Sequence, residues 1–322
     1  MRRPILRIAL FLVVVLLVHL GSRYVFMRWI EEQDPELGRE TAFVRDTSGP
    51  RIVILGDSHS LWGIAPDILK NSANLSAPGE GYLRCYYRLA YIMERHPESV
   101  ESVILPLELY SFFENYGMWF RDRNHVTRVS PATFLQGPKS YRESFPNYVR
   151  YYLFPYSDLT ETLETFSRTS VRQKAEELDT IRHRSLVGIN AENKARLAEM
   201  FLDLAMEDGA WYSQLQMDYL EKIVVLCEEH GVKLYLVRYP TTQYFCDAVS
   251  RRMPMNAYED CIAKFHERHP ETPILDYLKS FFGRDECFFD AHHLNYDGME
   301  EFTLCLAHDM GMQVGPRLAG GL

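Results

Sequence analysis

Five short apolar runs rich in Val, Ile and Leu alternate with amphipathic stretches, and this alternation constrains the fold more than any other feature of the chain. The runs are Arg51–Leu55, Ala73–Ala77, Ser102–Leu107, Val232–Arg238 and Pro273–Tyr277. The stretches with helical periodicity are Leu83–Arg95, Tyr212–His230, Ala257–Arg268 and Gly298–Met310. Continuous apolar runs are typical of parallel strands that are covered on both faces. The sequence therefore predicts an α/β fold, a three-layer, doubly wound parallel sheet.

The alternation is interrupted at about residues 113–210. This stretch contains an aromatic segment, Asn147–Tyr156, and the charged helical patterns of Leu159–Glu176 and Glu192–Met206. Loops at the carboxyl ends of strands carry the variable, function-specific parts of open α/β folds. We therefore expect one domain over residues 51–322 that carries a helical insertion on its ligand-facing end.

The N-terminus has the profile of a membrane anchor. The uncharged run from Ile8 to Gly21 follows Arg2, Arg3 and Arg7, and no small-residue cleavage site follows it. We expect a signal anchor over residues 1–27 and a polar stalk over 28–50; a cleaved signal peptide and a buried core helix are the alternatives. The positive-inside rule keeps the N-terminus in the cytoplasm, so the domain would be periplasmic on a single-pass cell-membrane protein.

The charge and cysteine content argue against a nucleic-acid-binding protein and against a cysteine-based zinc site. Lys+Arg 35 against Asp+Glu 44 gives a net charge of -9, which argues against nucleic acid as the main partner. The six cysteines form no CxxC pair, so they do not indicate a zinc site. Outside the cytoplasm disulfides are permitted, and Cys246 with Cys261 is the local pairing we expect, unless the cysteines are simply small buried hydrophobes.

The first apolar run ends in the turn Gly56-Asp57-Ser58-His59. A serine here stands at the carboxyl edge of a strand and at the start of a helix, where backbone N–H groups can stabilise an oxyanion. Ser58 is therefore a candidate nucleophile, and His59 could contact a substrate. The alternative is structural, since Asp57 or Ser58 could only cap the helix that follows.

A second polar cluster, Phe289–Asn295, precedes the last helical stretch. Asp290 and His293 are three residues apart, so the carboxylate can hold the imidazole Nδ1–H and leave Nε2 to accept a proton from a serine. A metal site is the competing idea. We expect none, because adjacent His292 and His293 point to different sides in extended backbone and no third strong ligand lies nearby in the sequence.

In these two motifs the sequence resembles the SGNH, or GDSL-like, hydrolase superfamily. Its first block is a GDS turn after strand one, and its last is a DxxH before the C-terminal helix; Ser58, Asp290 and His293 match them residue by residue. The resemblance covers residues 51–112 and 216–322. It implies a flavodoxin-like sheet, with Ser58 as nucleophile, His293 as general base and Asp290 as the carboxylate that orients it.

The resemblance also bears on the oxyanion hole. The segment NLSAPG is similar to the second block of the family, whose glycine donates a backbone N–H to the oxyanion. The resemblance assigns that role to Gly79, with Gly81 as the second choice. The third block, GxND after strand three, is missing, and Glu108 and Tyr110 stand where it would fall. Loss of one oxyanion donor costs about 10²–10³ in rate, so either Tyr110 or Asn115 substitutes for the missing Asn, or activity is low.

Similar departures occur in membrane-anchored SGNH-like proteins of alginate O-acetylation and lipoteichoic acid D-alanylation. We therefore expect an extracytoplasmic serine esterase or O-acyltransferase that acts on acyl esters of a cell-envelope glycan, without a metal or organic cofactor. Its expected partners are the acylated glycan, the membrane and a membrane-bound acyl-donor protein. The alternative is a catalytically silent SGNH-like binding or scaffold module of an envelope-modification complex.

Overall fold

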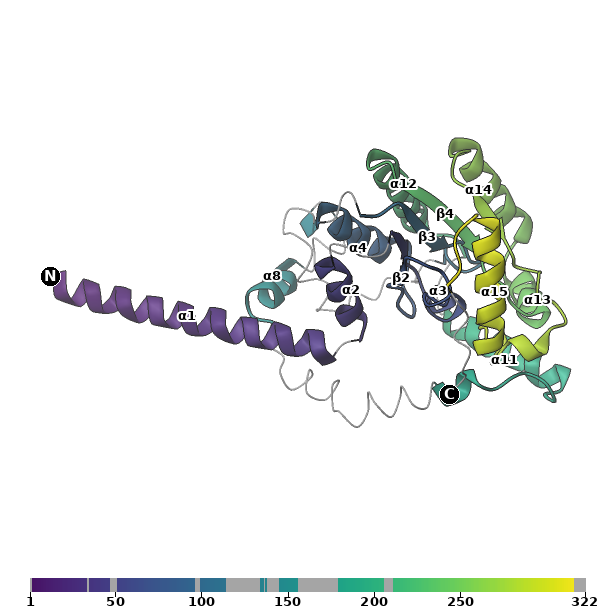
Figure 1. Cartoon of the computed structure of the whole chain (residues 1–322), viewed down its shortest axis with the longest axis horizontal. Helices are drawn as coiled ribbons and strands as arrows, with labels where there is room; N and C mark the ends of the chain where they lie inside the picture. The colour runs from purple at the N-terminus through teal and green to yellow at the C-terminus, as the bar shows by residue number, and fades with distance from the viewer. Residues whose placement is uncertain are drawn as a thin grey trace. The chain divides into compact units, whose positions relative to one another are not determined.

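The computed structural model describes residues 2–33, 35–46, 51–95, 99–113, 134–135, 137, 145–155, 179–205 and 211–315 (Figure 1). The chain divides into two compact units. One combines Met1–Ala42 with Phe120–Gln173, and the other combines Phe43–Trp119 with Lys174–Leu322. The second unit holds the sheet and both sequence motifs.

The sheet has five strands, all parallel, in the order β2-β1-β3-β4-β5. The strands are β1 (Ile52–Ile54), β2 (Ser72–Asn74), β3 (Ser102–Pro106), β4 (Lys233–Arg238) and β5 (Ile274–Asp276). The predicted doubly wound α/β sheet is confirmed, strand by strand and with boundaries within three residues. This order reverses direction between β1 and β3, and ligands of such sheets bind outside the carboxyl ends of the strands at that switch point.

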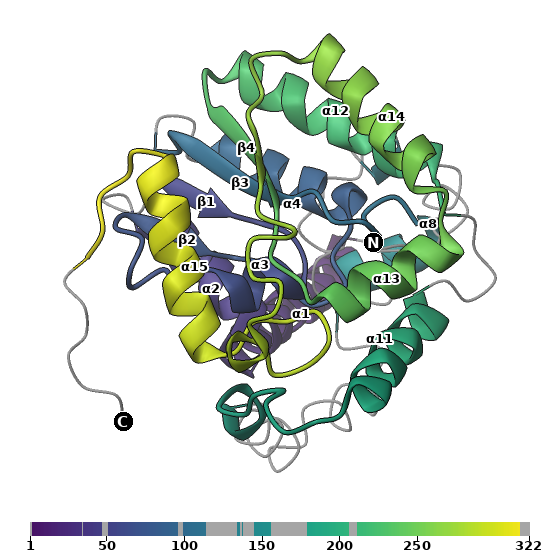
Figure 2. The same cartoon turned by 90° about the vertical axis from the view of Figure 1, so that its right-hand side faces the viewer.

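Helices cover the sheet and follow the predicted periodicity closely (Figure 2). Those of the sheet-bearing unit are α3 (Ser58–Gly63), α4 (Tyr82–Arg95), α11 (Ala191–Ala205), α12 (Gln214–Glu229), α13 (Gln243–Arg252), α14 (Met255–Arg268) and α15 (Tyr296–Asp309). A short 3-10 helix, η1 (Asp285–Cys287), precedes α15. The sequence did not predict α13, whose first turn is capped by the Thr242 hydroxyl accepting the Phe245 N–H.

Alternate residues of the strands face two separate layers. Ile54, Ile104 and Val237 pack with Phe302 and Leu306 of α15 in one apolar cluster. Their neighbours in the strands are also fully buried and face the opposite side, on which α4 and α12 pack against each other. Because both faces are covered, the strands are continuous apolar runs rather than alternating ones, as the sequence indicated.

The turn after β1 depends on a glycine. Gly56 has φ +125, and a Cβ there would lie 2.3 Å from Cδ of Pro106 in β3. We expect Gly56→Ala to destabilise the fold by about 3 kcal/mol, because backbone strain adds to a steric overlap in the core. Thermal unfolding of the detergent-solubilised full chain measures this effect.

Gly231→Ala is the matched control, since Gly231 also has a positive φ, +66, but open space around it. Its cost should be only about 1 kcal/mol. Equal losses in the two variants would show that the overlap with Pro106 does not matter.

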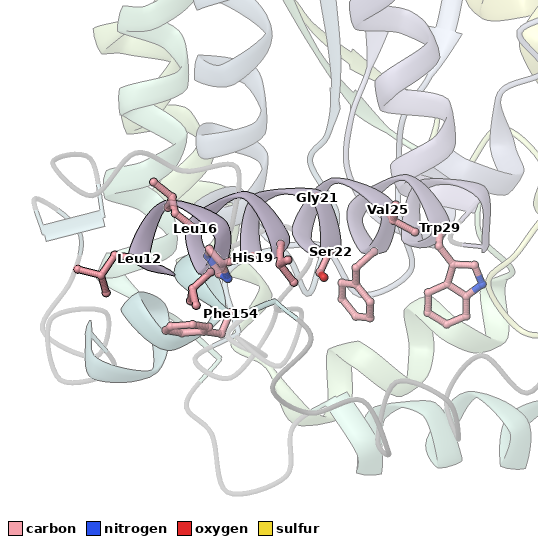
Figure 3. Close-up of a pocket in the computed structure, with 11 residues that line it drawn as sticks. Leu12, Leu16, His19, Gly21, Ser22, Val25, Trp29 and Phe154 are labelled. Atoms are coloured by element: carbon pink, nitrogen blue, oxygen red, sulfur yellow. The ribbon is translucent and has the colours of Figure 1, made fainter. Parts of the chain in front are cut away.

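The first unit contains the N-terminal helix α1 (Arg2–Gln33), and Pro4–Trp29 within it is long and apolar enough to cross a membrane. The predicted stalk is helical where it is described: α1 continues to Gln33, and α2 (Pro35–Arg45) follows. Phe154, just after α8 (Phe145–Leu153), faces His19 and Leu16 of α1 across a shallow apolar pocket (Figure 3).

The predicted insertion, residues 113–210, lies largely outside the described residues; α8 and α11 are its described helices. All six cysteines are free, so the expected Cys246–Cys261 disulfide is wrong for this structure. Cys246 stands on α13 and Cys261 on α14, and both are partly buried. The alternative interpretation, that several cysteines are small buried hydrophobes, agrees with the burial of Cys85, Cys227 and Cys287.

Candidate active site

Ser58 is the first residue of α3, directly after the Gly56 turn, and its side chain is partly buried. Asp57 caps the helix, since its carboxylate accepts the His59 N–H at 2.9 Å. The capping role that the sequence allowed therefore belongs to Asp57. Ser58 does not cap, and its hydroxyl is directed to the imidazole of a residue 235 positions away.

That imidazole is His293. Ser58 Oγ lies 2.8 Å from His293 Nε2, and His293 Nδ1 lies 2.7 Å from Asp290 Oδ2. Asp290 accepts the Nδ1–H, so Nε2 is left to accept the serine proton. The structure thus brings Ser58, His293 and Asp290 into one hydrogen-bonded chain, the arrangement in which a serine can be activated as a nucleophile.

The loop that carries the imidazole is held on both sides. Asp290 Oδ1 accepts the backbone N–H groups of His292 and His293, at 2.9 and 2.8 Å. Asn295 caps α15 by accepting the Gly298 N–H, and its own amide donates to the carbonyl of Glu286. This loop lies at the carboxyl edge of the sheet because it connects β5 to α15, which covers the face beside α3.

Burial and neighbouring charges set the protonation of this loop. Burial opposes ionisation of Asp290, but the imidazoles of His293 and His292 hold the pKa of its carboxyl well below the usual range. Burial, reinforced by the neighbouring His293, lowers the pKa of His292 well below its usual value. Asp290 is therefore a carboxylate and His292 a neutral imidazole at neutral pH.

His59 is buried, only 3% exposed, rather than presented to solvent. Its Nδ1 lies 3.3 Å from Oε2 of Glu108, whose other oxygen accepts the Tyr239 N–H at 3.0 Å. Burial alone would lower the pKa of His59, but the charge of Glu108 and its contact with the ring outweigh it and raise this pKa. Glu108 follows β3, so it reaches the site from the other side of the switch point.

Of the three residues predicted for the oxyanion hole, the structure describes Gly79 and Tyr110. Gly79 is exposed, with φ +70, in the turn after β2. The Ala77 N–H donates to the Gly56 carbonyl, so this loop runs beside the turn that carries Ser58. Tyr110 is buried, and its ring packs edge-on against His59. Asn115 lies outside the described residues.

Aromatic side chains border the His293 imidazole. The Trp62 ring meets the His293 ring edge-on at 4.6 Å, and Phe289 stacks on the same ring at 5.5 Å. Both aromatic residues are partly exposed, whereas His293 is 8% exposed. An apolar border of this kind suits the acyl part of an ester.

Two residues of the site, His292 and Glu108, were not predicted. The rings of His292 and His293 lie 3.9 Å apart, so the expectation that adjacent histidines diverge is wrong for this loop. His59, His292 and His293 each offer a ring nitrogen, and these atoms lie within 4.8 Å of one another. The signal for Glu108 was its place after strand three, where the resemblance expects a functional block.

Comparisons with known proteins show few similarities. A protein-family model without a functional description matches residues 199–314, which include Asp290 and His293 but not Ser58. No curated protein sequence matches the chain. A solved structure from Streptococcus pneumonia, described as a candidate platelet activating factor, is similar over 90% of this chain and 98% of its own, with 10% identity and a TM-score of 0.41.

Proposed function

We propose that this protein is an SGNH-type serine esterase or O-acyltransferase that acts on acyl esters of a cell-envelope glycan. The observation that carries the proposal is the chain of contacts from Ser58 Oγ through His293 to Asp290, at 2.8 and 2.7 Å. A serine that only capped a helix would have no need of an oriented imidazole. The flavodoxin-like strand order agrees with the fold that the SGNH resemblance implies.

The reaction would proceed through an acyl-enzyme. His293 Nε2 takes the proton of Ser58 as Oγ attacks the ester carbonyl, and Asp290 stabilises the imidazolium that forms. His293 then gives this proton to the alcohol that leaves. In the second half, His293 deprotonates water or a sugar hydroxyl, which attacks the acyl carbon. His293 then returns this proton to Ser58 Oγ as the bond between the acyl group and the serine breaks.

The oxyanion would form beside the turns that follow β1 and β2. We assign its donors to the backbone N–H groups of Ser58 and Gly79, because the Ala77–Gly56 hydrogen bond holds these two turns together. No side chain takes the place of the missing Asn in this assignment. The Tyr110 ring instead packs against the His59 ring. We therefore assign Tyr110 the role of supporting that ring.

Placement outside the cytoplasm is part of the proposal. The helix Pro4–Trp29 is long enough to span a bilayer, and Arg2, Arg3 and Arg7 precede or begin its apolar part, which favours a cytoplasmic N-terminus. Ser58 would then lie on the outer side, close to membrane-bound acyl donors and to the glycans of the envelope. Transfer to a sugar hydroxyl is favoured over hydrolysis by this proximity.

Labelling with a fluorophosphonate probe in the presence of EDTA tests the proposal. The wild-type chain should be labelled covalently, because the probe needs an activated serine, and Ser58→Ala should not be labelled. Ser60→Ala is the matched control, since Ser60 lies on the same helix but is fully buried, and this variant should be labelled like the wild type. Absence of label on the wild type would contradict the esterase and favour a silent scaffold module.

A further inference from the structure

We propose that His59, His292 and His293 form a Zn²⁺ site that shares His293 with the catalytic chain of contacts, so that a bound ion silences Ser58. The binding part stands by itself. The silencing part rests on the proposed function. The imidazoles of His59 and His292 have no role in the esterase mechanism, so that mechanism does not explain why they lie beside His293.

The three imidazoles meet in the interior of the site. They are 3%, 5% and 8% exposed, and one nitrogen of each lies within 4.8 Å of the others. The ring centroid of His59 lies 5.2 Å from that of His292 and 4.9 Å from that of His293. The ligands come from two distant parts of the chain, α3 and the loop before α15, which the fold holds together.

Each imidazole has its Nδ1 beside a carboxylate. His293 Nδ1 lies 2.7 Å and His292 Nδ1 3.4 Å from Asp290, and His59 Nδ1 lies 3.3 Å from Glu108. Histidines that bind metals almost always direct their second nitrogen to a carboxylate or carbonyl, which fixes the tautomer and strengthens the ligand. The three Nε2 atoms are thereby left as metal ligands.

The Nε2 atoms of His59 and of His292 are buried without a hydrogen-bond partner in the described part of the chain. Buried polar atoms of this kind are rare, because each loses its hydrogen bond to water on folding. An ion bound to the Nε2 atoms would satisfy them. Its two positive charges would also offset the negative charges of the partly exposed Asp290 and the buried Glu108.

The donor set selects the class of metal. Three imidazoles and one open position form a common tetrahedral zinc site, whereas Ca²⁺ and Mg²⁺ require oxygen ligands. With Zn–N bonds of about 2.0–2.1 Å, the nitrogens of such a site are about 3.3 Å apart. Water or Ser58 Oγ would fill the fourth position.

Metal binding and catalysis exclude each other at one atom. His293 Nε2 lies 2.8 Å from Ser58 Oγ and must accept its proton, but a nitrogen bound to Zn²⁺ has no lone pair for that proton. An occupied site would therefore remove the general base. Removal of the ion would restore it, and esterase activity would follow the zinc concentration inversely.

Calorimetric titration of zinc chloride tests the binding part. The protein is the detergent-solubilised full chain without a polyhistidine tag, freed of metals with EDTA and dialysed. We expect one ion per chain in the wild type and in Ser58→Ala, a rise in thermal unfolding temperature on binding, and affinity at least about 10-fold lower in His59→Gln and in His292→Gln. His308→Gln, on an exposed histidine of α15, should bind like the wild type.

The remaining outcomes separate the two proposals. Equal affinity in the wild type and both glutamine variants, or a wild type whose unfolding temperature zinc leaves unchanged, would overturn the site. Zinc should abolish fluorophosphonate labelling of the wild type and EDTA should restore it; full labelling in saturating zinc would overturn the competition. Zinc binding by a chain that never labels in EDTA would leave the metal site standing and contradict the esterase.

Discussion

Replacement of His293 by glutamine should lower kcat/KM for hydrolysis of p-nitrophenyl acetate at least about 10⁴-fold. Glutamine has no group that can accept the proton of Ser58, whose hydroxyl now lies 2.8 Å from His293 Nε2. The loss should appear mainly in kcat, because the imidazole acts in the transition state rather than in binding. Assays in EDTA with the detergent-solubilised full chain measure it.

His308→Gln is the matched control for this experiment. The His308 side chain is 88% exposed on α15, and its Nδ1 lies 3.0 Å from Oδ1 of its neighbour Asp309. Its removal should leave kcat/KM within about 2-fold of the wild type and should not alter thermal unfolding. A loss of less than about 10-fold in His293→Gln would show that another group acts as the base, and the assigned mechanism would fail.

Arg88→Met should destabilise the sheet-bearing unit by about 3–5 kcal/mol. Arg88 Nη1 donates to both carboxylate oxygens of Glu80, at 2.8 and 2.7 Å, and Nη2 donates to the Leu75 carbonyl at 2.6 Å. The side chains of the pair are 4% and 0% exposed. Without the Arg88 guanidinium, Glu80 keeps its charge in the interior and retains only the longer contact of Arg84 Nε with its Oε1, at 3.4 Å. The melting temperature should fall by about 10 °C.

The exposed ion pair of Arg51 with Glu101 supplies the control, since its side chains are 59% and 57% exposed. Arg51→Met should change stability by no more than about 1 kcal/mol. The double variant Glu80→Gln with Arg88→Met should recover part of the loss, because no uncompensated charge remains. Equal effects of Arg88→Met and Arg51→Met would contradict the importance of burial.

The sheet was predictable because its strands are buried on both faces and therefore have a simple apolar signature. The carboxyl ends of the first and last predicted strands also predicted where the Ser58 turn and the loop with Asp290 and His293 lie, at one edge of the sheet. Helix α2 was missed, although Pro35 at its first position and Glu36 in its first turn are helix-start signals. Composition alone had favoured a polar stalk there.

The inner half of the site was not predictable from sequence. Divergence of His292 and His293 is the rule for extended backbone, but Asp290 accepts both backbone N–H groups and turns this loop tightly. The pairing of His59 with Glu108 depends on tertiary contact across the switch point, between residues that are far apart in the sequence. Neither the residue types nor their spacing in the sequence predicts such a contact.

The distance in sequence between Ser58 and His293, 235 positions, has a consequence for the timing of activity. Chains are synthesised from the N-terminus, and contacts between distant segments form late in folding. Under the proposed function, the first half of the molecule would leave the ribosome with Ser58 unactivated. Only a chain that has completed its last strand and helix would place His293 beside Ser58, so an unfinished or misfolded copy would lack the proposed esterase activity.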